Sequence, residues 1–360
     1  MKELLSIAGT GIKSNFVTLK KPYKLNFAIT YRCNSRCLTC NIWQMKPKDE
    51  LTLDEIRAFA RNNNYFKWIE ITGGEPFLRS DIVDIVKAFK EHSKSLYIVT
   101  IPTNSLTDHN AVIEKIKAML NMGIPRIAIT VSLDGYRELH DKIRGVPGNY
   151  DKAIDMYKRL AALKKEYKNL YFVFGYTLSN LNAGQFQKTY EAVKSEIPNI
   201  TYNDFHINLA QISDNYYSNG NLSIKPSGDG IADEIAYVVS RRKKRLSAIE
   251  MIEHAFLKGL STYARTGKMP LHSRSLEASI FLDSFGNVYP SIMWNVKLGN
   301  IRDTGFNLDP ILNSKLSFSI RKDIEEGREP TQWTSCEAYQ AIMGKLPSLF
   351  TLSEKQNGNK

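Results

Sequence analysis

The sequence predicts an α/β protein, in which a partial (β/α)6 barrel of the TIM type precedes a small α+β C-terminal domain. Strand-like and helix-like segments alternate between residues 25 and 209, which specifies a parallel sheet with right-handed crossovers. Six such units curl toward a barrel but fall short of the eight that close one. Polar and glycine-containing motifs follow several of these strands, at the edge where parallel sheets place functional groups.

The expected strands are short apolar runs, and the helices between them show apolar residues at helical spacing. The strands are 25–30, 67–72, 96–101, 126–132, 170–177 and 204–209. The helices are 52–62, 81–91, 111–121, 150–165 and 184–194. Thr52 and Glu55 form a capping box at the first helix, and Pro102 is expected to stop the third strand.

The pattern changes after the sixth strand. Residues 227–265 are expected to be helical with a break near Arg241, and 278–289 to form a hairpin around the turn 283–287. We therefore expect five parts along the chain. They are an N-terminal extension (1–24), the barrel (25–225), a helical connector (226–268), the C-terminal domain (269–350) and a flexible tail (351–360).

Composition limits the possible functions. The chain has 360 residues, 42% of them hydrophobic, and a net charge of +12, which permits anionic partners without choosing among them. The densest basic run, Arg241 to Arg245, is interpreted as a solvated face, with a phosphate or lipid headgroup contact as the alternative. No aromatic residues interleave with it, so nucleic-acid binding is not expected. We find no membrane span and no signal peptide, and expect a cytoplasmic protein.

Three of the four cysteines lie within eight residues, in the spacing C-x-x-x-C-x-x-C: Cys33, Cys37 and Cys40. Three thiolates on one loop can hold three corners of a cubane iron–sulfur cluster, which leaves the fourth iron open to a ligand. The alternative is a structural zinc site with Cys336 as the fourth ligand, although zinc ligands usually come in closely spaced pairs.

Three further motifs sit at expected strand ends or shortly after them. Gly73-Gly74-Glu75-Pro76 follows the second strand, and its two glycines allow the backbone to approach a ligand. Asn104 follows the third strand, and the segment Ser132 to Gly135, with Asp134, follows the fourth. Such side chains suit a ribose, but they also favour ordinary turns. Arg144 lies in the segment HDKIRG, where a guanidinium fits a carboxylate or forms a surface salt bridge.

Together these motifs resemble the radical S-adenosylmethionine (SAM) superfamily. The resemblance implies that the three cysteines are catalytic and hold one [4Fe–4S] cluster, whose open iron is chelated by SAM. It further implies that Gly73, Gly74 and Glu75 bind the methionine amino group and that Arg144 meets the carboxylate. The remaining expected contacts to SAM are Ser132, with Asn104 and Asp134 nearby, and Trp43 as apolar cover of the cluster or adenine.

The C-terminal hairpin, with Asp283, Gly286 and Tyr289-Pro290, resembles the start of a SPASM or twitch domain. Ser291 stands where full SPASM members have a cysteine, so we expect no auxiliary cluster. Cys336 alone cannot hold one and is expected to be a small buried apolar residue.

The expected function is reductive cleavage of SAM to a 5′-deoxyadenosyl radical, which abstracts hydrogen from an unidentified sugar, nucleotide, lipid-linked or peptide substrate. An electron donor such as flavodoxin or ferredoxin is implied. The competing hypothesis is a non-catalytic binding protein stabilised by zinc or an iron–sulfur cluster. By position, His206 faces either the barrel lumen or a core, and Tyr216, Tyr217 and Trp294 line a cavity or pack.

Overall fold

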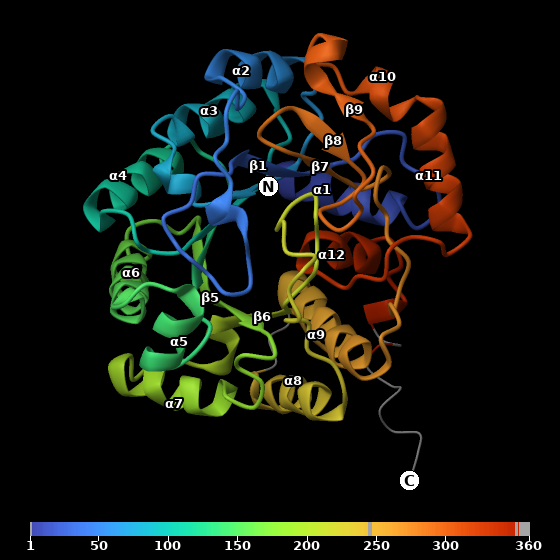
Figure 1. Ribbon diagram of the computed structural model, residues 1–360. Helices are drawn as coiled ribbons and strands as arrows, with labels where there is room; N and C mark the ends of the chain where they lie inside the picture. The colour runs from blue at the N-terminus through green and yellow to red at the C-terminus, as the bar shows by residue number, and fades with distance from the viewer. Residues whose placement is uncertain (1, 244–246, 350–351, 353–360) are drawn as a thin grey trace.

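The computed structural model describes residues 2–243, 247–349 and 352 (Figure 1). The strands are β1 (Lys24–Thr30), β2 (Trp68–Gly73), β3 (Ile98–Thr103), β4 (Arg126–Ser132), β5 (Leu170–Leu178), β6 (Phe205–Leu209), β7 (Ser279–Leu282), β8 (Asn287–Tyr289) and β9 (Gly299–Asn300). The helices of the first half are α1 (Lys2–Lys13), α2 (Leu53–Asn62), α3 (Ile82–His92), α4 (His109–Leu120), α5 (Arg137–Arg144), α6 (Asn149–Leu163) and α7 (Phe186–Glu196). Those of the second half are α8 (Asp229–Arg241), α9 (Ala248–Thr266), α10 (Asp309–Leu312), α11 (Lys315–Glu325) and α12 (Ser335–Met343).

All of these strands belong to one sheet in the order β6-β5-β4-β3-β2-β1-β7-β8-β9. Pairing is parallel from β6 to β7 and antiparallel from β7 to β9. The sheet curves with its helices outside, and its two edges do not pair with each other (Figure 1). The predicted α/β class and the partial, open barrel are confirmed.

The two faces of the curved sheet differ in chemistry. Residues that point outward toward the helices are apolar and fully buried, as Ile69 and Ile71 are in β2. The alternate residues point inward, because successive side chains of a strand point to opposite faces. They are mostly polar and, apart from buried residues such as Asn26, partly accessible. Those that line the lumen are Asn26, Glu70, Thr72, Thr100, Thr130, Ser132, Thr177, His206 and Asn208.

Helix α12 spans the gap between β1 and β6, on the inner side of the open barrel (Figure 1). On the β1 side, Lys24 Nζ donates to the carbonyl of Cys336 at 2.9 Å. On the β6 side, Asn208 Nδ2 donates to Ser335 Oγ at 3.5 Å. The sheet continues from β1 into β7, and the first turn of a helix far away in sequence closes the inner side of the barrel between β1 and β6, where it carries Cys336 into the lumen.

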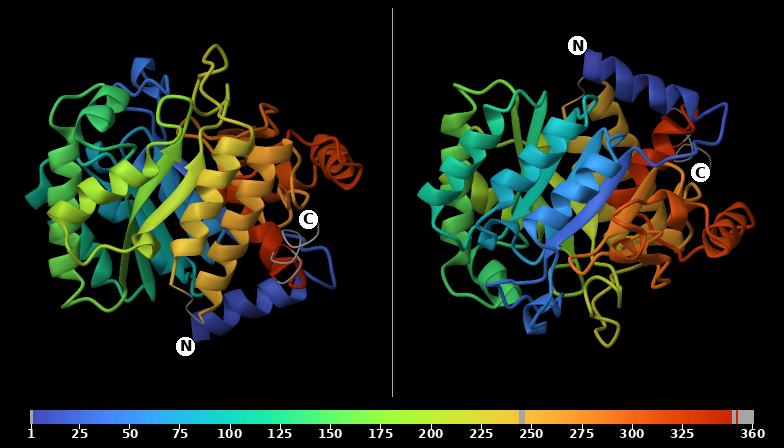
Figure 2. Two further views of the ribbon diagram at one scale, coloured as in Figure 1. Left: turned by 90° about the horizontal axis from the view of Figure 1, so that it is seen from below. Right: turned by 90° about the horizontal axis from the view of Figure 1, so that it is seen from above.

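Helix α1 covers the amino ends of the strands, at the end of the barrel opposite the loop of residues 210–225 (Figure 2). Lys67, just before β2, donates from Nζ to the carbonyl of Ser6 at 3.0 Å. Ile7 packs in a small apolar cluster with Tyr23 and Ala278. The carboxyl ends of the strands therefore form the accessible end of the barrel.

Most expected elements are present within two residues of their predicted bounds, and the hairpin and the break after Arg241 are confirmed. The predicted stop at Pro102 is wrong, because β3 continues to Thr103. Its pairing with β2 ends at Thr100, and beyond that residue β3 pairs with β4, so Pro102 interrupts no bond to β2. Lys244, Arg245 and the predicted tail, apart from Leu352, lie outside the described residues. Within the described part of the chain, no helix is long and apolar enough to cross a bilayer.

Candidate functional site

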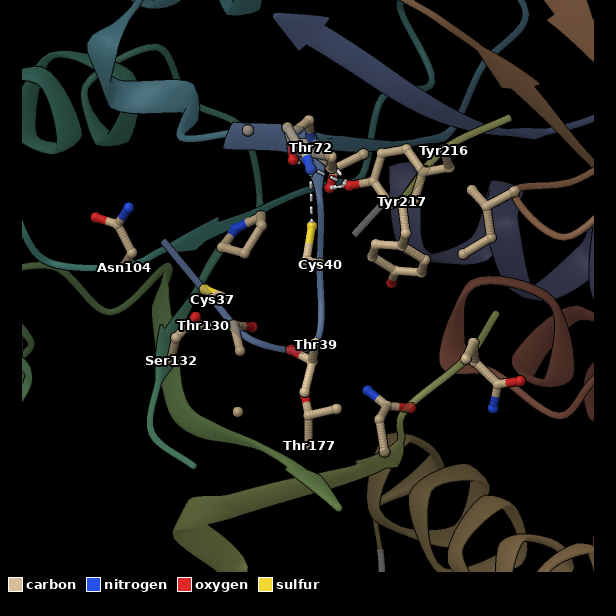
Figure 3. Close-up of a pocket in the computed structure, with 18 of the residues that line it drawn as sticks. Cys37, Thr39, Cys40, Thr72, Asn104, Thr130, Ser132, Thr177, Tyr216 and Tyr217 are labelled. Atoms are coloured by element: carbon tan, nitrogen blue, oxygen red, sulfur yellow. Dashed lines mark hydrogen bonds between the residues drawn. The ribbon is translucent and has the colours of Figure 1, made fainter. Parts of the chain in front are cut away.

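A cavity of about 300 Å³ opens at the carboxyl ends of the strands (Figure 3). All eleven site residues proposed from the sequence line it. They are Cys33, Cys37, Cys40, Trp43, Gly73, Gly74, Glu75, Asn104, Ser132, Asp134 and Arg144. They come from five different segments of the chain, which the parallel order of the strands and the curvature of the sheet bring together. We call this space the chamber.

The cysteine loop after β1 is tied to the barrel by backbone hydrogen bonds. Arg36 N donates to the carbonyl of Arg144 at 3.0 Å, and Leu38 N donates to that of Ile143 at 2.8 Å. From the opposite side, Asn219 Nδ2 donates to the carbonyl of Thr39 at 3.0 Å. The loop is therefore held at both flanks, which fixes where its three thiols lie.

The three thiols are free of disulfides and partly accessible to the chamber. Burial raises the pKa of Cys33 to about 11 and that of Cys40 to about 12. Cys37 Sγ lies 3.2 Å from Ser35 Oγ and 3.7 Å from a guanidinium nitrogen of Arg144. A metal ion bound at Cys33 and Cys40 would therefore have to displace a proton from each thiol, and its positive charge would stabilise the resulting thiolates.

The Gly73-Gly74 turn lies against the first strand and the cysteine loop. Gly73 has a φ of +127°, and a Cβ there would lie 2.0 Å from the carbonyl oxygen of Thr30. A Cβ on Gly74 would lie 2.1 Å from the carbonyl oxygen of Arg32. Only glycine fits both positions, because any larger residue pushes the turn away from the cysteines. Tyr216 Oη lies 3.3 Å from the Gly73 carbonyl and donates to it.

Glu75 is fully buried and braces this turn against the end of β3. Its carboxylate accepts hydrogen bonds from the backbone of Asn104 at 2.7 Å and from Thr103 Oγ1 at 3.1 Å. Burial raises the pKa of Glu75 to about 7 despite these donors. Asn104 Nδ2 in turn lies 3.8 Å from Cys33 Sγ, so β3 and the cysteine loop are linked through this group.

Arg144 and Asp134 form a buried ion pair, with Arg144 Nε 2.7 Å from Asp134 Oδ2. Asp134 Oδ1 also accepts from the backbone of Thr177 at 3.0 Å. His140 accepts at Nδ1 from the backbone of Asp134, and burial, with Arg144 nearby, lowers the pKa of His140 to about 3. A neutral imidazole therefore supports the pair, and the guanidinium retains further donors toward the chamber.

The deeper part of the chamber is built from residues that the motifs did not reveal. His206 lines it, with Nδ1 3.0 Å from Glu253 and Nε2 2.9 Å from Asn208, so it both faces the lumen and is satisfied. Burial opposes ionisation of Glu253, but His206 and other donors outweigh it and lower its pKa to about 2. Trp294 is buried in the main apolar core.

Two tyrosines and the fourth cysteine complete this deeper part. Tyr216 and Tyr217 line it beside Cys40 (Figure 3). Cys336 packs against a small apolar cluster, as expected, but it also lines the chamber, and its thiol donates to Glu70 Oε1 at 3.2 Å. The sequence carried one signal for this region, the regular alternation of polar residues in strands that a packed parallel sheet would fill with apolar ones.

The donor set of the cysteine loop fits a cubane cluster. Within the described residues, no three His, Cys, Asp or Glu side chains converge on one metal-ion position. A cubane does not require such convergence, since each thiolate binds a different iron. The thiol of Cys336, the fourth ligand of the zinc alternative, is engaged by Glu70.

The comparison with protein families agrees with this geometry. The family model of the radical SAM superfamily matches residues 27–193. The GTP 3′,8-cyclase of Limosilactobacillus fermentum is 35% identical over 161 residues, which cover 42% of this chain and 46% of that protein. The Fe-coproporphyrin III synthase of Methanosarcina barkeri is 31% identical over 139 residues, which cover 38% of this chain and 33% of that protein. The chain thus spans less than half the length of these relatives.

Solved structures extend the likeness in fold to almost the whole chain. The structure "Native anSMEcpe with bound AdoMet and Cp18Cys peptide" matches with a TM-score of 0.58 at 16% identity and covers 93% of this chain and 100% of that one. Streptococcus suis SuiB bound to S-adenosylmethionine matches with a TM-score of 0.54 at 16% identity, over 92% of this chain and 74% of that one. At such identity they show the fold alone. The likeness of the C-terminal part to a SPASM or twitch domain stays a prediction, and residues 27–193 match the radical SAM superfamily.

Proposed function

We propose that the protein is a radical SAM enzyme that abstracts a hydrogen atom from an organic substrate bound in the chamber. The observation that carries this proposal is that three free thiols and the eight other candidate residues line one cavity inside the barrel. The match of residues 27–193 to the radical SAM superfamily supports it independently.

In this proposal, Cys33, Cys37 and Cys40 hold the cluster after losing their protons. When bound, the cluster supplies the electron that cleaves SAM into methionine and a 5′-deoxyadenosyl radical. Arg144 carries donors for a carboxylate, and its pairing with Asp134 fixes the direction of the guanidinium. The barrel wall and its outer helices exclude water and oxidants from the reacting atoms.

The remaining candidate residues would position the cofactor. The backbone of Gly73 and Gly74 offers carbonyls to the ammonium, and Tyr216 Oη, which now donates to the Gly73 carbonyl, would give way to it. Glu75 keeps that turn in place. We assign Asn104, Ser132 and Asp134 to the ribose or carboxylate, and Trp43 to apolar cover. All of these line the chamber.

The lining also bears on the substrate. Among its described residues, Arg144 is the one Arg or Lys, and it is already paired with Asp134, whereas Glu70 and Glu75 add carboxylates. A phosphate group deep in the chamber would therefore meet no unpaired Arg or Lys side chain of the lining. The basic residues that give the chain its net charge of +12 lie mostly outside the chamber lining. We therefore propose that the part of the substrate that enters the chamber is polar and uncharged or cationic, as in a sugar or a peptide, and is not a nucleotide phosphate.

We further propose a cytoplasmic location and a low-potential donor such as flavodoxin or ferredoxin, because the cluster needs both a reducing environment and an electron. The five-part division made from the sequence remains our proposal. Its C-terminal part contributes Cys336 to the chamber lining and therefore serves as more than an outer cover.

Anaerobic reconstitution tests the proposal against a non-catalytic binding protein. The protein reconstituted with iron and sulfide should show the visible absorbance of an iron–sulfur protein, and dithionite with SAM should then release 5′-deoxyadenosine. The Cys37→Ala variant should lose both signals. Ser317→Ala, far from the chamber, is the matched control and should keep both. A colourless protein with stoichiometric zinc, or a Cys37→Ala variant with full SAM cleavage, would refute the proposal.

A further inference from the structure

The thiol of Cys336 faces the chamber from the first turn of α12, opposite the wall formed by β2. It donates to Glu70 Oε1 at 3.2 Å. Glu70 precedes Thr72 by two residues on β2, so both side chains point to the lumen, with Cα atoms roughly 6.6 Å apart. Thr72 leads directly into Gly73 and Gly74. The thiol therefore contacts the same lumenal side of β2 that leads into the turn that we assign to SAM.

Two tyrosines connect this thiol to the cysteine loop. Tyr216 Oη lies 2.5 Å from Thr72 Oγ1. Cys40 and Cys336 both pack against the same small apolar cluster that contains Tyr216, with Tyr217 also against it. Both thiols also lie close enough to raise the pKa of each tyrosine, although burial is the larger cause. The three cluster cysteines and Cys336 thus flank one shared volume.

That volume offers unused hydrogen-bond acceptors, which is an independent sign of a ligand. Asn26 and Gln211 belong to the chamber lining, and their buried side-chain oxygens, Oδ1 and Oε1, accept no hydrogen bond from any described residue. Asn26 is fully buried and Gln211 is 5% exposed. Buried acceptors without donors are costly, so a molecule with O–H or N–H groups is expected to occupy this space. A substrate placed there would lie between the SAM turn and Cys336.

The environment keeps Cys336 as a thiol. Burial raises its pKa well above the ordinary value, and the Glu70 carboxylate raises it further. A protonated sulfur is a poor nucleophile and a poor metal ligand. Its S–H bond, however, is weaker than the C–H bonds of sugars and close in strength to the Cα–H bond of a peptide, so it can give a hydrogen atom to a carbon radical. Among the described residues that line the chamber, Cys336 is the one thiol outside the cluster loop.

From this geometry we propose that Cys336 is a catalytic residue that donates a hydrogen atom to the substrate radical. This inference rests on the proposed function. It places the reaction among those that end by quenching a carbon radical, and not among dehydrogenations, which end by losing an electron.

In this step the Cys336 S–H bond breaks homolytically, a C–H bond forms on the substrate, and a sulfur-centred radical remains on Cys336. One electron from the iron–sulfur or flavin protein that also reduces the cluster, together with one proton from water, restores the thiol. Each turnover then uses one SAM, two electrons and one proton, and one hydrogen of the product originates from solvent.

The test uses the reconstituted holoprotein with SAM and dithionite in D₂O, without substrate. The Cys336 S–H exchanges to S–D, and the 5′-deoxyadenosyl radical then takes its hydrogen from groups that face the chamber. We expect mass spectrometry to find 5′-deoxyadenosine carrying one added deuterium, and this labelled fraction should fall several-fold in Cys336→Ala and Cys336→Ser. Ser317→Ala removes a hydroxyl outside the chamber lining and should leave the label unchanged.

Iron content and SAM binding of Cys336→Ser serve as the folding control, since serine keeps the size and the hydrogen bond to Glu70. Unlabelled 5′-deoxyadenosine from the wild type, or a label that persists in both Cys336 variants, would overturn the assignment while leaving the radical SAM activity intact. Absence of any 5′-deoxyadenosine from the wild type would instead refute the proposed function, and the role of Cys336 would fall with it.

Discussion

The buried ion pair between Lys24 and Glu70 gives the sharpest stability prediction. Lys24 Nζ lies 2.6 Å from Glu70 Oε2, donates to the carbonyl of Cys336 at 2.9 Å, and lies 4.3 Å from the centre of the Trp68 ring. The Lys24 side chain has no exposed surface. Its ammonium therefore depends entirely on these partners, and the same contacts join β1, β2 and α12.

Replacing Lys24 with methionine leaves the Glu70 carboxylate buried without its cation. Loss of one partner of such a pair costs about 3–5 kcal/mol of unfolding free energy, whereas removal of both charges is often nearly neutral. The double variant Lys24→Met/Glu70→Gln should therefore be more stable than Lys24→Met alone, by about 2 kcal/mol or more. The exposed pair Lys21–Asp309, at 2.8 Å, is the matched control, and Lys21→Met should cost no more than about 1 kcal/mol.

The assay is urea unfolding of the metal-free protein, with the free energy of unfolding compared at pH 7 and pH 5. In the wild type, burial opposes ionisation of Glu70, but Lys24 and the donors around it outweigh burial and keep the pKa below its usual range. The Lys24–Glu70 pair thus makes its full contribution to the free energy of unfolding at both pH values. This contribution is lost only below the usual carboxyl range, as pH falls through the pKa of Glu70 in the folded protein.

In Lys24→Met, burial is no longer opposed by the ammonium and the pKa of Glu70 rises. The folded state then takes up a proton as pH falls, and the deficit of this variant should shrink between pH 7 and pH 5. The reasoning is refuted if Lys24→Met lies within about 1 kcal/mol of the wild type at pH 7, the range of an exposed pair. It is equally refuted if the double variant is no more stable than the single one.

Three further predictions concern the chamber itself. Gly73→Ala should cost about 2–4 kcal/mol and weaken SAM binding in calorimetry, because its Cβ would lie 2.0 Å from the Thr30 carbonyl at a φ of +127°. The pKa of Glu75 is raised to about 7 in the folded protein. Ionisation of Glu75 therefore lowers the free energy of unfolding of the metal-free protein as pH rises from about 4.5 to 7, by up to roughly 3 kcal/mol. Glu75→Gln should flatten that part of the pH profile in urea unfolding. Asn219→Ala removes the donor to the Thr39 carbonyl, and a chelator should then strip iron from the reconstituted protein several-fold faster than from the wild type.

The barrel was predictable because its signals are local. Each strand of the first half is a short apolar run, and each helix between them has apolar residues at helical spacing. The cysteine spacing and the Gly73-Gly74 turn follow strands directly, so a parallel sheet necessarily brings them to one edge. Placement of the eleven candidate residues around one cavity follows from that topology, without any knowledge of side-chain contacts.

Contacts between distant segments were not predictable in this way. Helix α12 has an unremarkable pattern, and its position between β1 and β6 depends on single polar contacts, such as Lys24 to the Cys336 carbonyl and Asn208 to Ser335. Cys336 has no other cysteine near it in the sequence, and the residues around it show no pattern that distinguishes a position on the chamber wall from one in a packed core. The N-terminal helix α1 was missed because it buries little of its surface, with Ile7 and Gly11 as its buried residues, so its sequence shows no continuous apolar face.

The polar lumen explains why the open barrel needs α12. A closed (β/α)8 barrel fills its interior with layers of apolar side chains, whereas this one presents Glu70, Thr100 and Thr130 to its interior. Without a wall between β1 and β6, water would enter freely and screen every charge in the lumen. Helix α12 closes that gap with its own first turn, and there it contributes both an acceptor for Lys24 and a thiol held by Glu70. The Lys24–Glu70 pair is therefore a structural link to α12 and also the support that orients Cys336, so substitutions that loosen the pair should change the isotope label as well as stability.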